Sequence, residues 1–345
     1  MAQSMNIQKW YKSRIIRLSL QISNIYRSLT MKCFKSRYLP VLVISLLAFI
    51  AGCQKEPEMT REELVSYMAD QVSADNLESY TRWLEGMGTR FALADNRRDV
   101  AVKIRDRFVS MGYPDASLDS FYLQKTIREV EYSTWQYNVT ATVEGRENDS
   151  ISIVGAHYDS YASDGNPFVT APGANDNASG MAAVMEIARI IRGSRLRPKY
   201  SITFVAFAAE ELGLHGSRHQ AEKSANNGDD IIMMLNHDMI SYVAGPSSKP
   251  WSLNIIHYDN SGGLRNEAAL LCDANSTLIP YSDNAYNQRS DSYPYYLKGF
   301  RALFFHQSDE ENSYHTAGDR VSVCNFAYAA NVVKVSCALL VDKNY

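Results

Sequence analysis

The chain has 345 residues with a net charge of −3, and 46% of the residues are hydrophobic while 21% are charged. This composition is typical of a globular protein and excludes a disordered or fibrous chain. No basic stripe follows the first forty residues, so the sequence has no electrostatic footprint for nucleic acid, and we expect no such partner.

The N-terminal segment has the pattern of an export signal. A basic stretch at residues 31–37 precedes an apolar stretch at 38–50 that is too short to span a bilayer comfortably. The segment ends in Ile-Ala-Gly before Cys53, which resembles the lipobox of bacterial lipoproteins and implies cleavage before Cys53 and acylation of its thiol. The alternative is an uncleaved membrane anchor in which this cysteine stands by chance.

These features divide the start of the chain. Residues 1–30 precede a complete signal peptide, so we expect them not to belong to the native product. Residues 31–52 are predicted to be the signal peptide, and residues 53–60 a polar tether lipidated at Cys53. The mature protein would then be a lipoprotein of the bacterial cell envelope, held to the membrane through Cys53 and facing the periplasm or the outer surface.

The remaining cysteines do not suggest a disulfide framework. Cys33 would be lost with the signal peptide. Cys272, Cys324 and Cys337 are odd in number, and the last two flank or lie within one helical pattern, which would hold them too far apart to bridge. Although disulfides form readily in exported proteins, we expect buried free thiols here.

Residues 61–130 are expected to form the helical N-terminal part of the folded domain. Leu64, Met68 and Val72 recur at helical spacing, and the same period continues as far as Tyr113. No cluster of titratable side chains is present in this N-terminal segment, so we interpret the segment as scaffold.

Residues 131–345 are expected to form an α/β core. Short apolar or β-branched runs predict strands at residues 138–145, 151–156, 200–208, 231–235, 253–257 and 302–306. Helical patterns lie between and after them at residues 180–191, 213–223, 264–274 and 326–341. This alternation indicates a mixed, mostly parallel central sheet with helices on both faces, and no second block of composition indicates a further domain.

Chemically useful side chains follow three of the predicted buried strands. In sheets of this class, ligands bind where the strands end at their carboxyl edge. His157 ends the first of the three runs, and Asp238 follows the third. Glu210 and Glu211 follow the second. We therefore expect these side chains to meet at one edge of the sheet.

Taken singly, the candidates have simpler explanations. His157 could be a histidine satisfied at a strand end, and Asp159 could accept its other imidazole N–H. Asp176 could simply cap the helix predicted to start at Gly180.

The acidic pair and the later candidates have alternatives of the same kind. Glu210 and Glu211 could be a solvated pair at a helix start, although the apolar run before them would carry both to a sheet edge. His237 is an alternative ligand beside Asp238, and His315 lies in a polar loop, where a single histidine usually has no role.

Together, these residues form a ligand set. Two histidines and three carboxylates suit a pair of zinc ions that share one bridging ligand. Asp176 lies in a short loop bounded by Gly173 and Gly180, and a carboxylate held in this way can bridge two cations. One glutamate of the pair Glu210–Glu211 is then left free to act as a general base.

The chain resembles the co-catalytic dizinc aminopeptidases related to bacterial leucyl aminopeptidase and aminopeptidase S. Five segments carry the resemblance, in the order and at the spacings of that family: Gly-Ala-His-Tyr-Asp-Ser at 155–160, Pro-Gly-Ala-Asn-Asp-Asn-Ala-Ser-Gly at 172–180, Phe-Ala-Ala-Glu-Glu-Leu-Gly-Leu-His-Gly-Ser at 207–217, Asn-His-Asp-Met at 236–239, and Tyr-His-Thr-Ala-Gly-Asp at 314–319. The resemblance spans roughly Leu77 to the C-terminus and implies the α/β sandwich of the zinc exopeptidases.

The resemblance also implies two zinc ions and a role for each matched ligand. Asp176 would bridge the ions. His157 and Asp238 would complete one zinc site. Glu211 and His315 would complete the other.

Further roles follow from the same family. Glu210 would be the general base that later protonates the leaving amine, and Asn177 would follow the bridging aspartate in a cis peptide. Tyr314 matches a tyrosine that helps to hold the oxyanion in some members and is absent from others, so core packing is the alternative. The implied activity is removal of N-terminal residues from peptides that carry a free α-amino group.

One departure and two rival functions remain open. Family members often have Ser-Asp-His where this chain has Ser290-Asp291-Ser292, so the side-chain preference cannot be carried over. Glutaminyl cyclases share the fold and use a single zinc, whereas some relatives, such as the transferrin-receptor ectodomain, are metal-free binding modules. The five intact ligands argue against both alternatives.

Overall fold

The computed structural model describes residues 59–345 apart from 128, 148 and 246–249, and this part forms one compact unit. Residues 1–30, the expected signal peptide, Cys53 and most of the expected tether lie outside the described residues. Within the described part, no helix combines the length and the apolar character needed to cross a membrane.

Helices and strands alternate along most of the chain. The helices are α3 (Arg61–Ala69), α4 (Ala74–Glu85), α5 (Arg97–Ser110), α6 (Gly180–Ser194), α7 (His215–Asn227), α8 (Gly262–Asn275), α9 (Ser292–Leu297) and α10 (Phe326–Asn344), with shorter turns at Ala174–Ser179 and Val321–Val323. The strands are β1 (Ser117–Ile127), β2 (Val130–Val143), β3 (Ile151–His157), β4 (Ser201–Phe207), β5 (Ile231–His237), β6 (Ser252–His257), β7 (Ile279–Tyr281) and β8 (Ala302–Gln307).

The strands form one sheet in the order β1-β2-β4-β3-β5-β8-β6-β7. The four central strands β4, β3, β5 and β8 are parallel to one another, whereas β2 is antiparallel to β1 and β4, and β6 is antiparallel to β8. The predicted mixed, mostly parallel sheet is confirmed, together with the six strands and four core helices that the sequence indicated.

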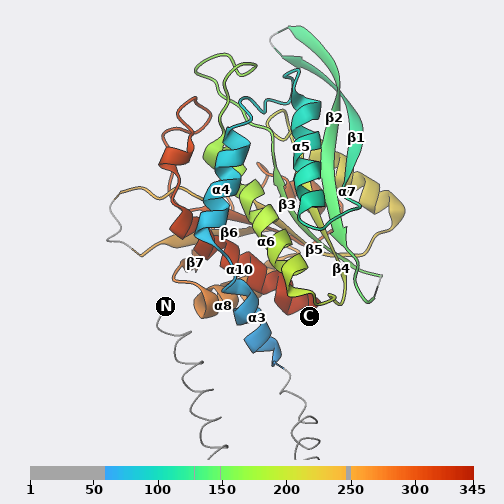
Figure 1. The fold of residues 1–345 in the computed structure, drawn as a ribbon, viewed down its shortest axis with the longest axis vertical. Helices are drawn as coiled ribbons and strands as arrows, with labels where there is room; N and C mark the ends of the chain where they lie inside the picture. The colour runs from blue at the N-terminus through green and yellow to red at the C-terminus, as the bar shows by residue number, and fades with distance from the viewer. Residues whose placement is uncertain (1–58, 128, 148, 246–249) are drawn as a thin grey trace, which may run out of the picture. The chain divides into compact units, whose positions relative to one another are not determined.

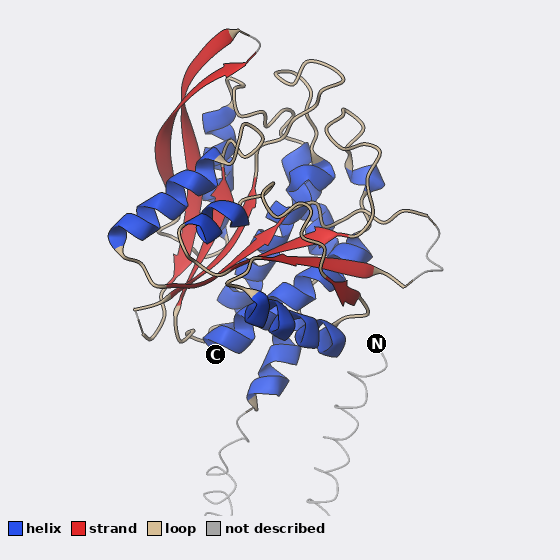
Figure 2. Cartoon of the chain, turned by 180° about the vertical axis from the view of Figure 1, so that it is seen from behind, coloured by secondary structure: helices blue, strands red, loops and turns tan. Residues whose placement is uncertain are grey.

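Helices cover both faces of the sheet. Strand β3 shows this, because its successive side chains point to opposite sides and contact different helices. On β3, Val154 and Ala156 pack in the large core that includes residues of α3, α4, α6 and α10. Ile153 instead packs with Ala221 of α7 and Tyr295 of α9. Figure 1 shows α4, α6 and α10 in front of the sheet, and Figure 2 shows the sheet from behind, where α7 crosses it.

The N-terminal part departs from the prediction for residues 61–130. It is helical through α5, which ends at Ser110, but β1 then pairs with β2 in a long hairpin that extends beyond the rest of the sheet (Figure 1). Leu123 is the only buried residue of β1, so the strand lacks the apolar alternation that marks a half-buried strand in a sequence. The prediction of a helical part up to residue 130 is therefore wrong beyond Ser110.

One buried glutamate fastens the N-terminal helices to the core. Glu186 of α6 is fully buried, and its carboxylate accepts hydrogen bonds from the backbone N–H of Ser73 at 2.9 Å and from Nδ2 of Asn76 at 3.1 Å. Arg189 pairs with the same carboxylate at 2.7 Å. Because Ser73 and Asn76 form the start of α4, this contact fixes α4 against α6.

The central parallel strands bring the candidate residues to one edge. His157 at the end of β3 lies opposite Phe207 at the end of β4. The chain that leaves β4 therefore reaches Glu210 and Glu211 beside His157, and the chain that leaves β5 reaches Asp238 at the same edge. The predicted meeting of these side chains follows directly from the strand order.

Candidate metal centre

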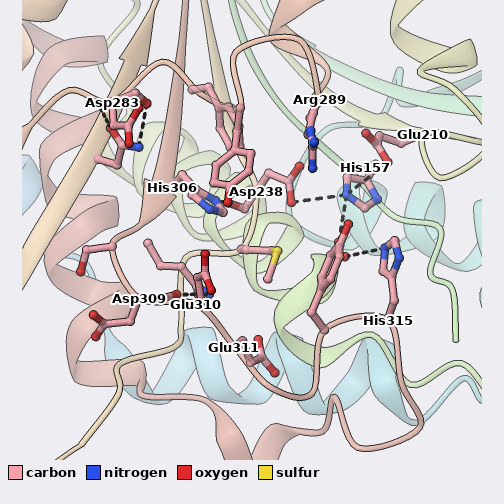
Figure 3. A pocket seen from close by; sticks show the side chains of 18 of the residues that line it. His157, Glu210, Asp238, Asp283, Arg289, His306, Asp309, Glu310, Glu311 and His315 are labelled. Atoms are coloured by element: carbon pink, nitrogen blue, oxygen red, sulfur yellow. Dashed lines mark hydrogen bonds and ion pairs between the residues drawn. The ribbon is translucent and has the colours of Figure 1, made fainter. Parts of the chain in front are cut away.

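The six candidate side chains line one cavity of about 370 Å³ at this edge. Figure 3 labels His157, Glu210, Asp238 and His315 among them. The six side chains form two groups, in each of which one ligand atom per residue lies within 4.8 Å of the others: His157, Glu210 and Asp238 in the first, and Asp176, Glu211 and His315 in the second. The five expected ligands and the expected base are therefore together in the fold.

Asp176 faces both groups. Its Oδ1 lies 3.3 Å from Nε2 of His157, and its Oδ2 lies 3.2 Å from Nε2 of His315. The same imidazole atoms approach further carboxylates, since His157 lies 3.5 Å from Asp238 and His315 lies 2.8 Å from Glu211. One carboxylate thus presents one oxygen to each of two clusters, which is the arrangement of a bridging ligand.

The loop that carries Asp176 is held by hydrogen bonds from distant segments. The carboxylate of Asp319 accepts the backbone N–H groups of Asn175 at 2.7 Å and of Asp176 at 2.9 Å. Asn177 donates from Nδ2 to the carbonyl of His237, and the Asp176–Asn177 peptide is cis, as the family resemblance implied. Sequence reasoning included Asp319 in a motif but gave it no role.

Gly180 allows this loop to pack directly against β5. A Cβ atom at this position would collide with the carbonyl oxygen of His237 and with Oδ1 of Asn177. The backbone N–H of Gly180 also donates to Asn177 Oδ1 at 2.9 Å. Any larger residue would therefore displace the loop from the end of β5.

Asp159 is placed differently from the expectation. Its backbone carbonyl, at 3.1 Å, lies nearer to Nδ1 of His157 than its carboxylate does, at 3.7 Å. The carboxylate instead accepts the backbone N–H groups of Glu210 at 3.0 Å and Glu211 at 3.2 Å. Asp159 therefore positions the acidic pair as well as the imidazole.

Asp238 and His237 point in opposite directions, as alternating strand residues do. Asp238 lines the cavity, and its Oδ2 accepts a hydrogen bond from the hydroxyl of Ser290 at 2.6 Å. His237 lies in the core, where its Nε2 contacts the hydroxyl of Ser336 at 2.7 Å and its ring stacks on Phe305. The alternative in which His237 is a ligand is therefore wrong.

Negative charge is crowded in this buried place. Burial raises the pKa of Glu211 to about 7 and raises the pKa of Glu210 well above its usual value. Burial would also raise the pKa of Asp176, but hydrogen bonds from His157 and His315 outweigh it and hold that pKa below the usual range. Buried carboxylates repel one another, and a bound cation would reduce this repulsion.

Arg90 is a buried part of the site that sequence reasoning missed. Its guanidinium is 1% exposed and donates to the backbone carbonyls of Tyr158 at 2.8 Å, Pro172 at 2.7 Å and Gly173 at 2.7 Å. It thus joins the end of β3 to the loop that carries Asp176. No local sequence pattern marks Arg90, because its partners are backbone carbonyls, most of them from two distant segments.

Tyr314 does not pack in the core. Its side chain is about half exposed, lines the cavity, and stacks on the ring of His315 with centroids 3.8 Å apart. The alternative in which Tyr314 packs in the core is therefore wrong. The remaining thiols are free, with Cys272 and Cys337 buried and Cys324 partly so.

Comparisons with known proteins find similar sequences and similar folds. A protein of Leptosphaeria maculans named as a probable zinc metalloprotease is 27% identical over 331 residues, which cover 81% of this chain and 76% of that protein. Among solved structures, the LapA aminopeptidase of Legionella pneumophila matches with a TM-score of 0.67 and 24% identity, covering 84% of this chain and 77% of that chain. A glutaminyl cyclase of Fimbriiglobus ruber matches with a TM-score of 0.65 and 16% identity, covering 79% and 95%.

The structural matches show the fold, and a match to a family pattern shows the family. The pattern described as peptidase family M28 matches residues 138–340, which is more than half of the chain and contains every candidate ligand. The chain therefore belongs to peptidase family M28.

Proposed function

We propose that this peptidase is an aminopeptidase that holds two zinc ions and removes N-terminal residues from peptides with a free α-amino group. The observation that carries the proposal is the position of Asp176, whose two carboxylate oxygens are directed to His157 and His315. Each imidazole also has a carboxylate neighbour of its own, Asp238 or Glu211. Two ligand groups that share one carboxylate fit two ions.

The donor set fits zinc. Imidazole nitrogens and carboxylate oxygens are ordinary zinc ligands, and a catalytic zinc keeps a coordination position open toward a cavity. Both groups of ligands face the cavity described above. Bound zinc would supply Lewis-acid polarisation of the scissile carbonyl and would lower the pKa of the attacking water.

Glu210 is the residue left to move the proton. It lines the cavity beside the ligands. Its Oε2 lies 3.9 Å from Nε2 of His157, whereas the carboxylates of Asp176 and Asp238 lie nearer to that atom, at 3.3 Å and 3.5 Å. A carboxylate in this position can accept a proton from water and pass it to the leaving amine. Asp159, which holds the backbone of Glu210, fixes the direction of that carboxylate.

The carboxylates also favour a positively charged α-amino group. Four acidic side chains line the cavity: Asp176, Glu210, Glu211 and Asp238. A substrate ammonium placed there is attracted by these acidic neighbours, whereas the uncharged N–H of an internal peptide bond is not. This supports exopeptidase action over cleavage within a chain. Tyr314, which lines the cavity beside His315, is placed to support the oxyanion.

A glutaminyl cyclase is the second candidate, since an enzyme of that kind has a similar fold. The presence of two ligand groups favours the aminopeptidase, because a single-zinc enzyme would leave one group without a metal. The complete ligand set likewise argues against a metal-free binding module.

The experiment uses residues 54–345 and short peptides read by mass spectrometry, one with N-terminal Leu, its N-acetylated form, and one with N-terminal Gln. We expect whole residues to be lost from the peptides with a free N-terminus and not from the N-acetylated peptide. A chelator should abolish this loss, zinc should restore it, and elemental analysis should find two zinc ions per chain. Loss of ammonia alone from the Gln peptide would identify a cyclase. No reaction of zinc-loaded protein would contradict both enzymes.

We also propose that the protein is a lipoprotein of the bacterial cell envelope, acylated at Cys53. The lipobox-like run before Cys53 supports this. Incorporation of a fatty-acid probe into the full chain, and its loss in Cys53→Ser, is the expected result. Equal labelling of both chains would contradict it.

A further inference from the structure

One cationic side chain stands on the wall of the acidic cavity. Arg289 is the only arginine or lysine among the described residues that line it. Figure 3 shows its side chain directed toward Asp238 and His157, on the side of the cavity where the ligands lie.

The position of Arg289 is tied to the metal centre. Its backbone N–H donates to the carbonyl of Tyr286 at 2.9 Å, and its guanidinium lies over the ring of Tyr286, with Cζ 5.3 Å from the ring centroid. The next residue, Ser290, donates its hydroxyl to Oδ2 of the candidate ligand Asp238. The guanidinium is therefore carried by a turn that is anchored to a metal ligand one residue away.

The guanidinium has no carboxylate partner within the described residues, at the ion-pair distance of 4.0 Å. Two acidic residues of the same wall have other partners, since Asp283 accepts the backbone N–H of Ala285 and Asp309 accepts that of Ala244. The N–H donors of Arg289 are thus available to a bound molecule. A planar guanidinium matches a carboxylate with two parallel hydrogen bonds.

We propose that Arg289 binds a carboxylate of the substrate next to the scissile bond. The inference rests on the proposed aminopeptidase function and deepens it, because it names peptides that carry a carboxylate near the scissile bond as the preferred substrates. The carboxylate is either the side chain of an N-terminal Asp or Glu, or the free α-carboxylate of a dipeptide. Asp283, Asp309 and Glu310 line the cavity as well and would repel an anion, so the carboxylate is accepted only beside Arg289.

Two matched substrate pairs distinguish the sources. Glu-Ala-amide and Gln-Ala-amide differ in the side-chain carboxylate, whereas Ala-Ala and Ala-Ala-amide differ in the α-carboxylate. We expect kcat/KM to favour the acidic member of one pair by about 10- to 100-fold, the value of a hydrogen bond to a charged group. The pair that shows the preference identifies the carboxylate.

Variants assign the preference to Arg289. In Arg289→Gln the acid-to-neutral ratio should fall to near one, and in Arg289→Lys it should fall in part, because an ammonium keeps the charge but not the planar fork. Arg146→Gln, an exposed arginine in the loop between β2 and β3, should retain the full ratio. Zinc content and the thermal unfolding midpoint check that each variant is folded and loaded.

A binding measurement separates this inference from the proposed function. Calorimetry compares L-glutamate with L-glutamine, and Ala-Ala with its amide, on zinc-loaded wild type, Arg289→Gln and Arg146→Gln. If no peptide is hydrolysed but acidic ligands bind more tightly only when Arg289 is present, the aminopeptidase proposal fails and the carboxylate site stands. If wild type shows no preference for the acidic member in turnover or binding, or if Arg289→Gln retains it, the carboxylate site is wrong.

Discussion

The floor and the wall of the cavity are built in different ways. The floor consists of the strand-end residues His157, Glu210, Glu211 and Asp238 together with Asp176, and their side chains are at most 10% exposed. The wall includes residues of the loops 282–289 and 308–315, some of whose side chains are exposed. In the proposed reaction these regions would have two tasks, because the floor would carry the chemistry and the wall would select the substrate.

His315 shows where the two regions meet. It is the one candidate ligand carried by the wall, and its side chain is 25% exposed, whereas that of His157 is 1% exposed. Its loop is held by the backbone N–H of Ser163, which donates to the carbonyl of His315 at 2.8 Å. A wall loop can therefore vary in sequence only as long as it still delivers this imidazole to Asp176.

The largest expected effect comes from the floor. Glu210→Gln should lower kcat by about 100- to 10,000-fold, because proton transfer is lost while the ligands remain. Elemental analysis should still find two zinc ions per chain, and Glu222→Gln on the exposed surface of α7 is the matched control. Near-normal turnover of Glu210→Gln would show that another group is the base.

A smaller effect is expected beneath the floor. The carboxylate of Asp159 accepts the backbone N–H groups of Glu210 and Glu211. In Asp159→Asn, the amide can accept only one of these hydrogen bonds, because its NH₂ group faces the other N–H. We expect a loss of about 10- to 100-fold in activity or zinc affinity, as for other groups that orient metal ligands. Zinc titration against a competing chelator, together with kcat, measures it. A variant that is only less stable, with unchanged zinc affinity and kcat, would contradict a positioning role.

The smallest effect is expected on the wall. Tyr314→Phe keeps the ring that stacks on His315 and removes only the hydroxyl. If the hydroxyl supports the oxyanion, kcat should fall roughly 2- to 10-fold with little change in KM, the value of one neutral hydrogen bond. An unchanged kcat would limit Tyr314 to packing against the imidazole.

The floor could be predicted from the sequence because buried strands have a strong local pattern. The apolar runs before His157, Glu210 and Asp238 end where the structure ends β3, β4 and β5, give or take a few residues. Parallel strands share their carboxyl edge, so the meeting of these residues followed from the pattern alone. The cis peptide after Asp176 came instead from the family resemblance.

Other features depended on contacts that no local pattern records. β1 was missed because only Leu123 is buried, and Arg90 was missed because it binds carbonyl groups from distant segments. The sequence marked Ser290-Asp291-Ser292 as a departure from the family, but it could not show that the preceding Arg289 faces the cavity. Side-chain direction in a loop depends on the turn around it, which is tertiary information.

The bond from Asp319 to the loop of Asp176 has a consequence for biosynthesis. Ribosomes deliver the chain from its N-terminus, so His157, Asp176, the acidic pair and Asp238 all emerge long before Asp319 and His315. Until the segment with these last two residues docks, the Asp176 loop lacks the acceptor for its backbone N–H groups and one imidazole is missing. The candidate ligands therefore come together only after the segment that carries His315 and Asp319 has emerged and docked.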